Sequence, residues 1–491
     1  MVVFFEGLAE AYKVLKTESL TFCKRVFLLI LGLNLSFMTN LVYAATGEDG
    51  SSSVTKLQYS FPTKKNATEY FLETSYESFS SLRSSEAPGV SPVLLKAQFK
   101  TKKTKYYFLN SKIEIAPNVS SKPYLIIKDA YVRLPVTTKS SLSFGFKDIV
   151  WNEIDHQWGL GIWQPQVRRD YLNPEQTGLP GIYFTKNMDL KRKHKIKTTL
   201  FFSGLFFPDQ GPHYEEVNGK IRSNNPWFSE PGDYIGIQET PTEIFYKINE
   251  PEVSEIIKQH SFALKAKYIY DKYFWINMAY ANKPMNQLGI LMTHHLNALV
   301  GDMHTSVNIR PEVIRHSVAS IDFGFIEKQS KIWLSMNYDS PFVNENLNSG
   351  TERSELSQSY FAAVFLSHNL IKTPYEFHGG ILVSDVNVLN KNKDSILENV
   401  EDSLARFDYD EFTTLGFKKK TIDTQISYGF DYFYSIKKQG GFFKSNIVYH
   451  YSRKLHFNAG IKIIGSMQEN NSFYSKYREN DSLVVGVKYV F

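Results

Sequence analysis

The stretch DSLVVGVKYVF, residues 481–491, has two faces of different character when it is read as a strand. Every second position from Leu483 to Phe491 carries an apolar or aromatic side chain, whereas the other face carries Ser482, Val484, Gly486, Lys488 and Val490. Because successive side chains of a strand point to opposite faces, this pattern predicts a strand with one apolar face. An ordinary edge strand of a soluble protein is the alternative.

The same alternation recurs along most of the chain after residue 66. The clearest examples are residues 93–99, 142–146, 262–270, 426–434 and 455–463. A soluble sandwich also contains such strands, but a long series of them favours a membrane barrel, whose outer face contacts lipid. Aromatic residues make up 15% of the chain, with 37 Phe and 30 Tyr, although its mean hydropathy is −0.30. A barrel combines these properties because only alternate positions face lipid.

The links between the expected strands are alternately short and long. Short polar links occur near residues 101–104, 135–140, 270–272, 327–331 and 452–454, and long ones at 80–91, 151–179, 205–260, 338–358 and 466–481. Outer-membrane barrels have tight periplasmic turns and long outer loops. If the first strand occupies residues 67–79, both ends of the chain lie on the periplasmic side, with the short links. We count 20 strands, or 18 if residues 288–325 hold one long strand instead of three.

A terminal strand that ends on an aromatic residue resembles the closing strand of bacterial outer-membrane β-barrels. The resemblance implies that Phe491 is read by the barrel-assembly machinery. The run from Asp129 to Pro135, followed by Phe144-Gly-Phe-Lys147 and Trp151, resembles a degenerate pattern of porin-like barrels, including exopolysaccharide-export and substrate-specific porins. Together these features predict an all-β transmembrane antiparallel barrel of about 18–20 strands in a Gram-negative outer membrane, in contact with its lipids and lipopolysaccharide. Association into homotrimers is left open.

The first 44 residues match a secretory signal peptide with an extended basic region. Lys24-Arg25 precede an apolar run at residues 26–37, and small residues end at Ala44. The run is shorter than the roughly 20 residues of a membrane helix, and a membrane anchor or buried helix is the alternative. Translation could also start near Leu15 or Leu20. We therefore expect a signal at 1–44, a periplasmic lead-in at 45–66 and a barrel at 67–491.

Several classes of function find no support in the sequence. The one cysteine, Cys23, precedes the expected cleavage site, which excludes disulfides and thiol chemistry from the mature chain. A net charge of +6 is too small for this length to indicate a nucleic-acid partner. The neighbouring His and Ser at 260–261 and 316–317 point to opposite faces of a strand, and His294-His295 likewise diverge. We expect no enzyme, no cofactor and no metal site.

The polar face of the expected strands defines the lining of the bore. Basic residues are spread over most of the wall and acidic residues are concentrated on the early strands. The expected pore-lining residues are Lys96, Lys100, Lys147, Lys195, Lys197, Lys265, Lys267, Lys462, Glu73, Glu77, Asp129 and Arg133. A net positive wall predicts a preference for anionic solutes. The alternative is that these charges pair with one another across strands in a plugged interior.

Two long loops, residues 151–179 and 205–260, flank one hairpin and therefore emerge on the same side. They are rich in aromatic residues and we expect them to fold against the barrel mouth or into the bore. The residues expected to form a constriction or a ligand platform are Trp151, Trp158, Trp163, Arg168, Arg169 and Trp227. The sequence thus predicts a channel for passive diffusion of small hydrophilic solutes, anionic ones among them. The alternative is a non-conducting surface barrel that binds polysaccharide or a partner through its aromatic loops.

Overall fold

The computed structural model describes the chain from residue 69 onward, with gaps. The described ranges are 69–79, 93–101, 106–117, 119–191, 193–237, 240–299, 302–342, 351–353, 356, 358–370, 373–386, 411–419, 425–467 and 473–491. The expected signal peptide and lead-in, residues 1–44 and 45–66, lie outside these ranges. No helix in the described ranges is long and apolar enough to cross a membrane.

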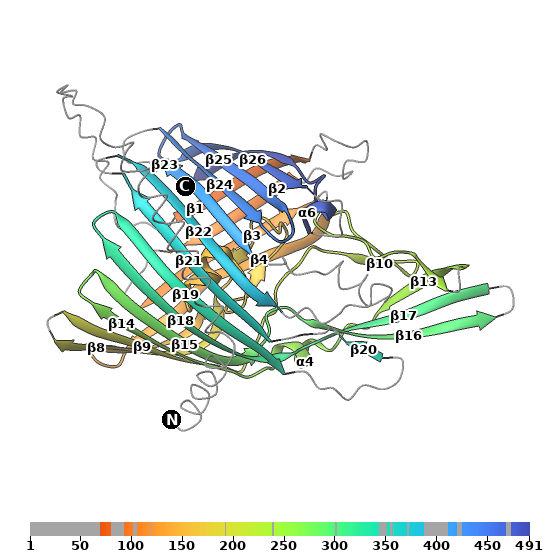
Figure 1. The fold of residues 1–491 in the computed structure, drawn as a ribbon, viewed down its shortest axis with the longest axis horizontal. Coiled ribbons are helices and arrows are strands. Elements are labelled where there is room, and N and C mark those ends of the chain that lie inside the picture. Colours follow the sequence, from red (N-terminus) through yellow and green to blue (C-terminus); the bar gives the residue numbers. More distant parts are fainter. Residues whose placement is uncertain are drawn as a thin grey trace. The chain divides into compact units, whose positions relative to one another are not determined.

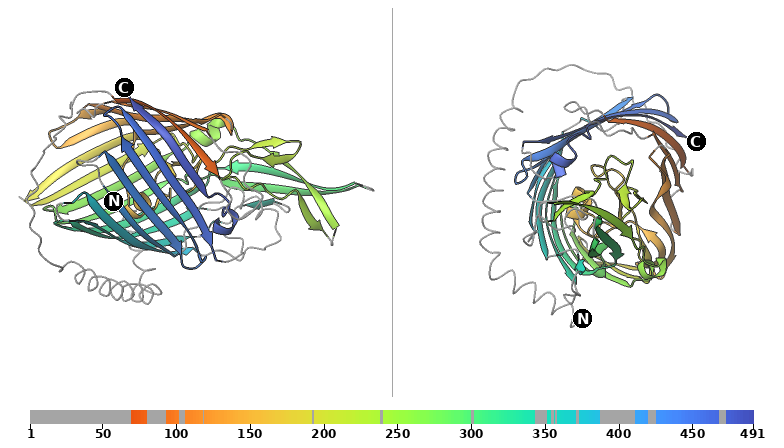
Figure 2. Two further views of the ribbon diagram at one scale, coloured as in Figure 1. Left: turned by 90° about the horizontal axis from the view of Figure 1, so that it is seen from above. Right: turned by 90° about the vertical axis from the view of Figure 1, so that its right-hand side faces the viewer.

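Within these ranges, eighteen antiparallel strands form one closed sheet (Figures 1 and 2). Around the wall they are β1 (Glu69–Phe79), β2 (Val93–Lys100), β3 (Tyr107–Ala116), β4 (Ser120–Pro135), β5 (Ser140–Lys147), β8 (Leu179–Lys191), β9 (His194–Ser203), β14 (Ser261–Tyr270), β15 (Phe274–Pro284), β18 (Arg315–Glu327), β19 (Ser330–Phe342), β21 (Ser359–Asn369), β22 (Tyr375–Val386), β23 (Phe412–Lys419), β24 (Ile426–Ser435), β25 (Gly440–His450), β26 (Leu455–Ser466) and β27 (Ser482–Val490). The predicted all-β barrel is confirmed, with the smaller of the two strand counts.

The last strand closes the barrel against the first, as the sequence predicts. β27 pairs antiparallel with β1 from Phe71↔Val490 to Phe79↔Ser482, and its other edge pairs with β26. The closure leaves the sheet with no free edge, so every strand has two bonded neighbours. Because the two strands are antiparallel, the start of β1 lies beside the end of β27, at the end of the barrel where the links between strands are short. We call that end the short-turn end.

Alternation along each strand separates an apolar outer face from a polar inner one. On β1, Leu72 is 54% exposed on the outside, whereas the inward Glu77 is 1% exposed. Ile113 and Leu483 are similarly exposed on the outer face. Exposed apolar surface on this scale is unusual for a soluble monomer and is typical of a lipid-facing wall. Exposed aromatic residues gather near the short-turn end as Tyr106, Tyr107, Tyr270, Tyr273, Phe325, Tyr451 and Phe491, which matches an interfacial aromatic girdle.

The region that the sequence left ambiguous, residues 288–325, holds three strands, of which only β18 joins the barrel. β16 (Gly289–Leu299) and β17 (Asp302–Glu312) form a hairpin that extends beyond the barrel end (Figure 1). They belong to a five-stranded outer sheet with β12 (Tyr234–Ile237), β13 (Thr240–Ile248) and β20 (Thr351–Arg353). The region therefore adds one strand to the barrel, as the count of 18 requires, but it does so as three strands and not as one long strand. Strand pattern alone did not reveal that two of the strands pack against residues of the second long loop.

The remaining elements belong to the long links. They are α3 (Glu153–Trp158), β6 (Gln166–Val167), β7 (Glu175–Gln176), β10 (Glu215–Val217), β11 (Lys220–Arg222), α4 (Val253–Ile257) and α6 (Phe473–Lys476). The outer sheet has its own core, formed by Ile221, Phe228, Ile244, Tyr246, Ile290, Met292, Val307 and Ile309. A larger core lies inside the barrel and joins the loop between β5 and β8 to the inner wall.

Candidate functional site: the constricted bore

The link between β5 and β8, residues 148–178, folds into the barrel, and we call it the bore loop. Its first turn is the short helix α3. The Asn152 side chain caps this helix by accepting a hydrogen bond from the Asp155 N–H. Gly159 ends it in a left-handed conformation with φ of 62°, which costs glycine little. The sequence NEIDHQWG therefore carries both the start and the stop of the helix.

Polar side chains of β15, β18 and β19 hold the first part of the bore loop. Asp322 Oδ1 accepts a hydrogen bond from Asn152 Nδ2 at 2.7 Å, and its Oδ2 accepts one from Asn277 Nδ2 at 2.6 Å. Asn277 Nδ2 also donates to the Trp151 carbonyl at 2.8 Å. Trp163 Nε1 donates to Asn337 Oδ1 at 2.9 Å. These hydrogen bonds fix the loop to one side of the wall.

Apolar packing reinforces that side. The Trp151 and Trp163 rings stack at 5.7 Å between centroids, with an angle of 10° between their planes. Trp158 meets Phe433 of β24 edge-on at 6.2 Å. Trp227, from the second long loop, packs edge-on against Tyr171 of the bore loop. All four predicted tryptophans are buried, so their ring faces contact protein and are not open to a solute.

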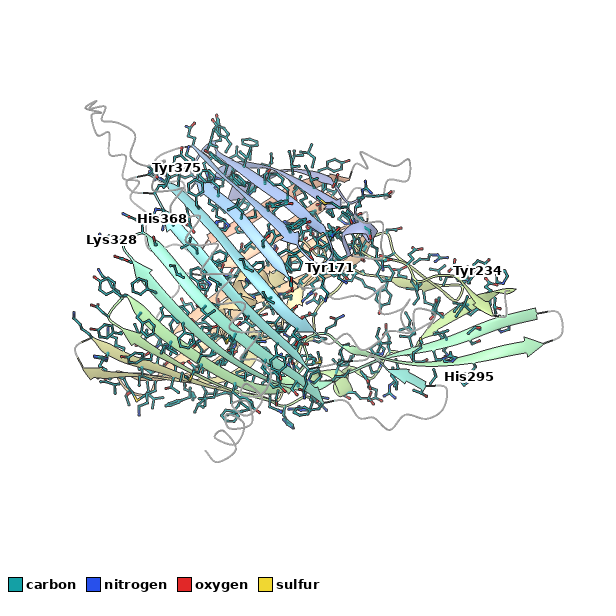
Figure 3. All side chains as sticks on the ribbon, in the orientation of Figure 1. Tyr171, Tyr234, His295, Lys328, His368 and Tyr375 are labelled. Atoms are coloured by element: carbon teal, nitrogen blue, oxygen red, sulfur yellow. The ribbon has the colours of Figure 1, made fainter. Side chains whose placement is uncertain are left out.

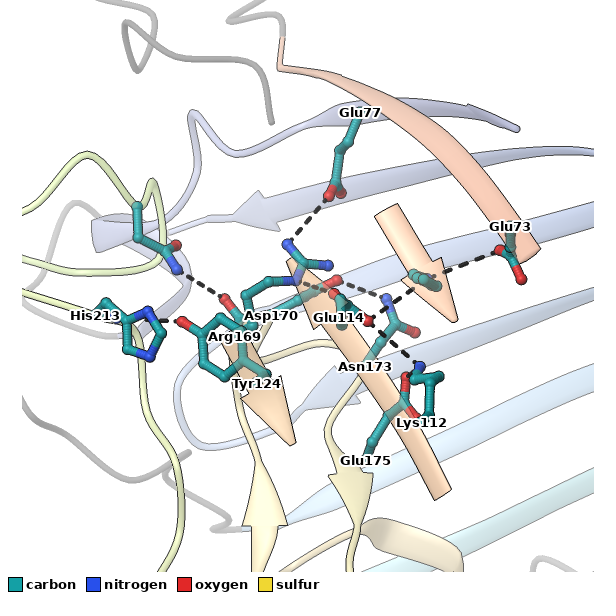
Figure 4. Close-up of polar contacts among 12 residues, drawn as sticks. Glu73, Glu77, Lys112, Glu114, Tyr124, Arg169, Asp170, Asn173, Glu175 and His213 are labelled. Atoms are coloured by element: carbon teal, nitrogen blue, oxygen red, sulfur yellow. Dashed lines mark hydrogen bonds and ion pairs between the residues drawn. The ribbon is translucent and has the colours of Figure 1, made fainter. Parts of the chain in front are cut away.

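The other end of the bore loop meets the wall through ion pairs (Figure 4). Arg169 Nε lies 2.5 Å from Glu114 Oε1, and its Nη1 lies 3.7 Å from Glu77 Oε2. Lys462 of β26 pairs with Asp170 Oδ2 at 2.5 Å and also with Glu77. Thus the basic Arg169 of the loop pairs with acidic residues of the wall, and the acidic Asp170 of the loop pairs with a basic residue of the wall.

Charges on β2 and β3 extend this network. Lys112 pairs with Glu175 of the bore loop and lies 3.3 Å from Glu114 Oε2. Lys96 lies 3.9 Å from both Glu73 and Glu114. Arg168 follows a different path, because it is buried, donates to the Leu160 carbonyl at 2.8 Å and lies 3.4 Å from Asp209 of the second long loop. It therefore ties the two loops together and does not face the ionic network.

Burial and pairing act in opposite directions on the loop's charged groups. Burial alone would raise the pKa of Asp170, but Lys462 and Arg169 hold it well below its usual range. Burial likewise opposes the charge of Arg169, and Glu114 and Glu77 raise its pKa above the usual value. Asp155 differs: its burial raises its pKa, although the N–H groups of Ile162 and Trp163 bind the carboxylate. Asp170 and Arg169 are therefore charged at neutral pH.

A cavity of about 600 Å³ lies between the ionic part of the bore loop and the wall. Its lining comes from residues 167–175 of the loop and from β1–β4 and β23–β27. Its charged residues are Glu73, Glu77, Glu114, Asp170, Glu175, Asp431, Lys96, Arg169, Lys418, Lys419, Lys444 and Lys462. Amides and hydroxyls, among them Asn173, Asn446, Asn458 and Ser427, complete the lining. This polar composition suits a hydrated solute.

Three lysines of this lining differ from the rest. Among the described residues, no salt bridge within 4.0 Å joins Lys418, Lys419 or Lys444 to a carboxylate. Lys419 Nζ instead lies 5.5 Å from the centre of the Tyr428 ring. Lys444 Nζ lies 3.5 Å from the Leu172 carbonyl and 5.2 Å from the centre of the Phe433 ring. Asp431, directly opposite Lys444 in register, instead accepts a hydrogen bond from His378 Nε2 at 2.7 Å.

The remaining predicted wall residues lie outside the lining of the cavity. Lys147 lies over the rings of Tyr131 and Tyr183 at 5.2 and 5.3 Å. Lys267 lies over Trp275 at 4.1 Å, and Lys265 donates to the Val150 carbonyl. The others occupy inward positions by register: Lys195 and Lys197 of β9, Lys100 of β2, and Asp129 and Arg133 of β4. Of the predicted wall residues, only Glu73, Glu77, Lys96 and Lys462 line the cavity.

Sequence reasoning missed several members of the site. Lys112 and Lys444 alternate with Ile113 and Phe443, so the same strand rule would have found both. The pairing of Glu175 with Lys112 has no signal in the sequence, because the two lie 63 residues apart. A loop's path through a barrel depends on packing that alternation does not encode.

These features define the class of the protein. A closed antiparallel barrel of eighteen strands, apolar outside and charged inside, with short turns at one end and long loops at the other, is a bacterial outer-membrane β-barrel of porin-like architecture. The cavity and the inserted loop belong to that architecture.

Comparisons with known proteins do not assign the chain to a family. No family model matches the chain and no curated protein matches it significantly. Among solved structures, Acinetobacter baumannii OccAB3 aligns over 86% of this chain and 98% of its own, with 9% identity and a TM-score of 0.42. The Pseudomonas aeruginosa outer membrane protein OpdK aligns over 86% and 98%, with 10% identity and a TM-score of 0.40. A loop-deletion mutant of Vibrio cholerae OmpT aligns over 87% and 98%, with 9% identity and a TM-score of 0.34. Scores of this size establish no relationship, and the class rests on the barrel itself.

Proposed function

We propose that this barrel is a porin-like channel for the passive diffusion of small hydrophilic solutes. The observation that carries the proposal is the charged cavity of about 600 Å³ between the bore loop and the wall. A barrel filled only to give stability would bury apolar residues throughout, as it does on the side of Trp151 and Trp163. Instead, the opposite side keeps ionised groups around an open volume, which requires water.

We further propose that the channel prefers anions. The cavity lining contains six carboxylates and six basic side chains, so its formal charge is balanced. The charges are equal in number but differ in pairing. Each carboxylate is bound by Lys, Arg or His, whereas Lys418, Lys419 and Lys444 make no such pair among the described residues. An anionic solute can therefore meet three ammonium groups without first displacing a bound carboxylate.

Planar-bilayer recording of the purified full-length barrel tests both parts. Discrete conductance steps are expected, and the reversal potential in a salt gradient should show anion selectivity. Changing both Lys418→Gln and Lys444→Gln should reduce that selectivity at least about twofold while conductance steps persist. The Lys454→Gln change, in the exposed turn between β25 and β26, is the matched control and should have no effect. A cation-selective wild-type channel would contradict the anion preference alone, and a barrel without conductance would contradict the channel.

The outer sheet favours one second candidate, a surface barrel that binds polysaccharide or a partner. Its β12 and β13 expose Tyr234 and Phe245, which are 63% and 36% exposed, and Tyr234 lies on the part that extends past the barrel (Figure 3). Aromatic faces of this kind stack on sugar rings. This candidate differs from the expected ligand platform, whose tryptophans are buried. A silent barrel that retains soluble glycans through Tyr234 would favour it over the channel.

A further inference from the structure

Two histidines face each other across β25 and β26, near the short-turn end of the bore. His450 and His456 are directly opposed in register. Their Nδ1 atoms lie 2.8 Å apart, and their ring centres are 4.8 Å apart with planes at 79°. Asn446 and Asn458 of the same two strands line the cavity. The histidine pair therefore lies on the same inner wall, further toward the turn.

Each ring has a hydrogen-bond partner besides the other histidine. His450 Nε2 lies 3.1 Å from Ser427 Oγ on the neighbouring strand β24. A hydrogen bond also joins the His456 side chain to the backbone of Arg453. When the Nε2–H of a histidine donates to an oxygen, the Nδ1 lone pair is available as a ligand. Supporting contacts of this kind typically fix the tautomer and orientation of metal-binding histidines.

The distance between the two Nδ1 atoms is informative about the metal. Imidazole nitrogens bind transition metals at about 2.0–2.1 Å. Two such ligands at 90° to one another are separated by roughly 2.8–3.0 Å, whereas tetrahedral ligands are separated by roughly 3.3–3.4 Å. The 2.8 Å between the two Nδ1 atoms is a hydrogen bond between the rings, so one Nδ1 carries a proton that the metal must displace. Once that proton is lost, the same separation suits the 90° arrangement. Square-planar and octahedral ions such as Cu²⁺ and Ni²⁺ take this geometry with nitrogen ligands.

We propose that His450 and His456 form a binding site for one divalent transition-metal ion, with Cu²⁺ the preferred ion and water completing its coordination. In the part of the chain that the structure describes, no cluster of three or more His, Cys, Asp or Glu side chains accompanies them. The site therefore offers two protein ligands from adjacent strands. Cu²⁺ leads the affinity order of divalent first-row metals for such sites.

Nearby charge sets the strength of this site. Lys488 lies opposite His456 in register on β27, with its Nζ 3.6 Å from the centre of the Phe71 ring. A neighbouring ammonium repels a divalent cation, so affinity is lower than for an isolated histidine pair. Changing Lys488→Gln should therefore tighten binding. A bound ion would add positive charge to the inner wall. Neither the proposed diffusion of solutes nor the barrel fold depends on this metal site.

Copper titration of the untagged, full-length barrel in detergent tests the proposal. Electron paramagnetic resonance should show one Cu²⁺ with two imidazole nitrogens, and competition with a chelator gives its affinity. His450→Gln and His456→Gln should each lower that affinity at least about tenfold and remove one nitrogen from the spectrum. Ser427→Ala leaves both ligands in place and should lower affinity by about tenfold, as loss of a supporting contact does.

The matched control is His368→Gln. His368 Nδ1 lies 2.8 Å from Ser330 Oγ. This histidine therefore shares the serine contact but has no second imidazole beside it among the described residues, and its removal should leave Cu²⁺ affinity unchanged. Heat-modifiable migration on gels shows that each variant is folded. The proposal is overturned if the wild-type spectrum contains fewer than two imidazole nitrogens at the tight site. It is also overturned if folded His450→Gln and His456→Gln barrels bind Cu²⁺ as tightly as the wild type.

Discussion

The two ends of the bore loop are held by different kinds of interaction. Against β15, β18 and β19, Trp151 and Trp163 are buried and form neutral hydrogen bonds with asparagine side chains: Asn277 donates to the Trp151 carbonyl, and the Trp163 indole donates to Asn337. Against β1, β3 and β26, Arg169 and Asp170 are held by ion pairs beside an open cavity. We call these the apolar anchor and the ionic anchor.

The two kinds of interaction suggest a different function for each end of the bore loop. The apolar anchor excludes water and has stacked rings, so its geometry is rigid and insensitive to salt. The ionic anchor is in contact with the cavity, where its charges remain in reach of water and solute. We infer that the first anchor sets how wide the remaining passage is, and that the second sets which charge passes. Disrupting each anchor in turn should therefore change conductance and selectivity differently.

The largest effect is expected from breaking the apolar anchor with Trp151→Ala. Truncating a fully buried tryptophan costs roughly 3–5 kcal/mol of packing energy, which should release the loop from that wall. Single-channel conductance should rise severalfold, with little change in ion selectivity. Phe202→Ala removes an aromatic ring that is 52% exposed on the outer face, and it should leave conductance unchanged. An unaltered conductance in folded Trp151→Ala barrels would show that this anchor does not set the width.

A smaller change in width and a larger change in selectivity are expected from Lys462→Met. The substitution leaves Glu77 and Asp170 without their shared ammonium, at a cost near the lower end of the roughly 3–5 kcal/mol for breaking a buried pair. The two carboxylates, then left with Arg169 as their shared cation, should shift the reversal potential toward cations. Adding Glu77→Gln to Lys462→Met removes one of these carboxylates and should restore part of the anion preference. If reversal potentials of the single and double variants coincide, the ionic anchor does not control charge selection.

The sequence predicted the wall far better than the loop. Alternation decides which residues face outward, and it assigned Lys96, Glu77 and Lys462 to the inside without any knowledge of the fold. The closing pair of strands followed from the same rule. The bore loop obeys no such period, because its residues are fixed by partners far along the chain. Asn152 meets Asp322 across 170 positions, for example.

The loop tryptophans show that the sequence can identify important residues without revealing what they do. Their abundance in the loops predicted either a constriction or a platform, and both readings use the same residues. The choice depends on whether the rings are covered, and the partners that cover Trp163 and Trp158 come from β19 and β24. Likewise, alternation left residues 288–325 as one strand or three and could not show that two strands there leave the barrel for an outer sheet.

The smallest predicted effect is a difference in how the two anchors respond to acid. The pKa of Asp170 is lowered in the folded protein, so its stabilisation is present above the unfolded value, about 3.9, and is lost only as pH falls through the still lower folded value. The pKa of Asp155 is raised, so its buried charge costs stability at neutral pH, and this cost is relieved as pH falls through the folded value. Mild acid should therefore strengthen the apolar anchor and leave the ionic one intact.

Hydrogen-exchange protection factors of the Ile162 and Trp163 amides, which bind Asp155, should rise as pH is lowered from 7 toward 4. Asp155→Asn removes the titrating group and should abolish that rise, whereas Asp170→Asn should not. Protection that falls over this range in the wild type would mean that the carboxylate form of Asp155 holds the loop more firmly than the acid form.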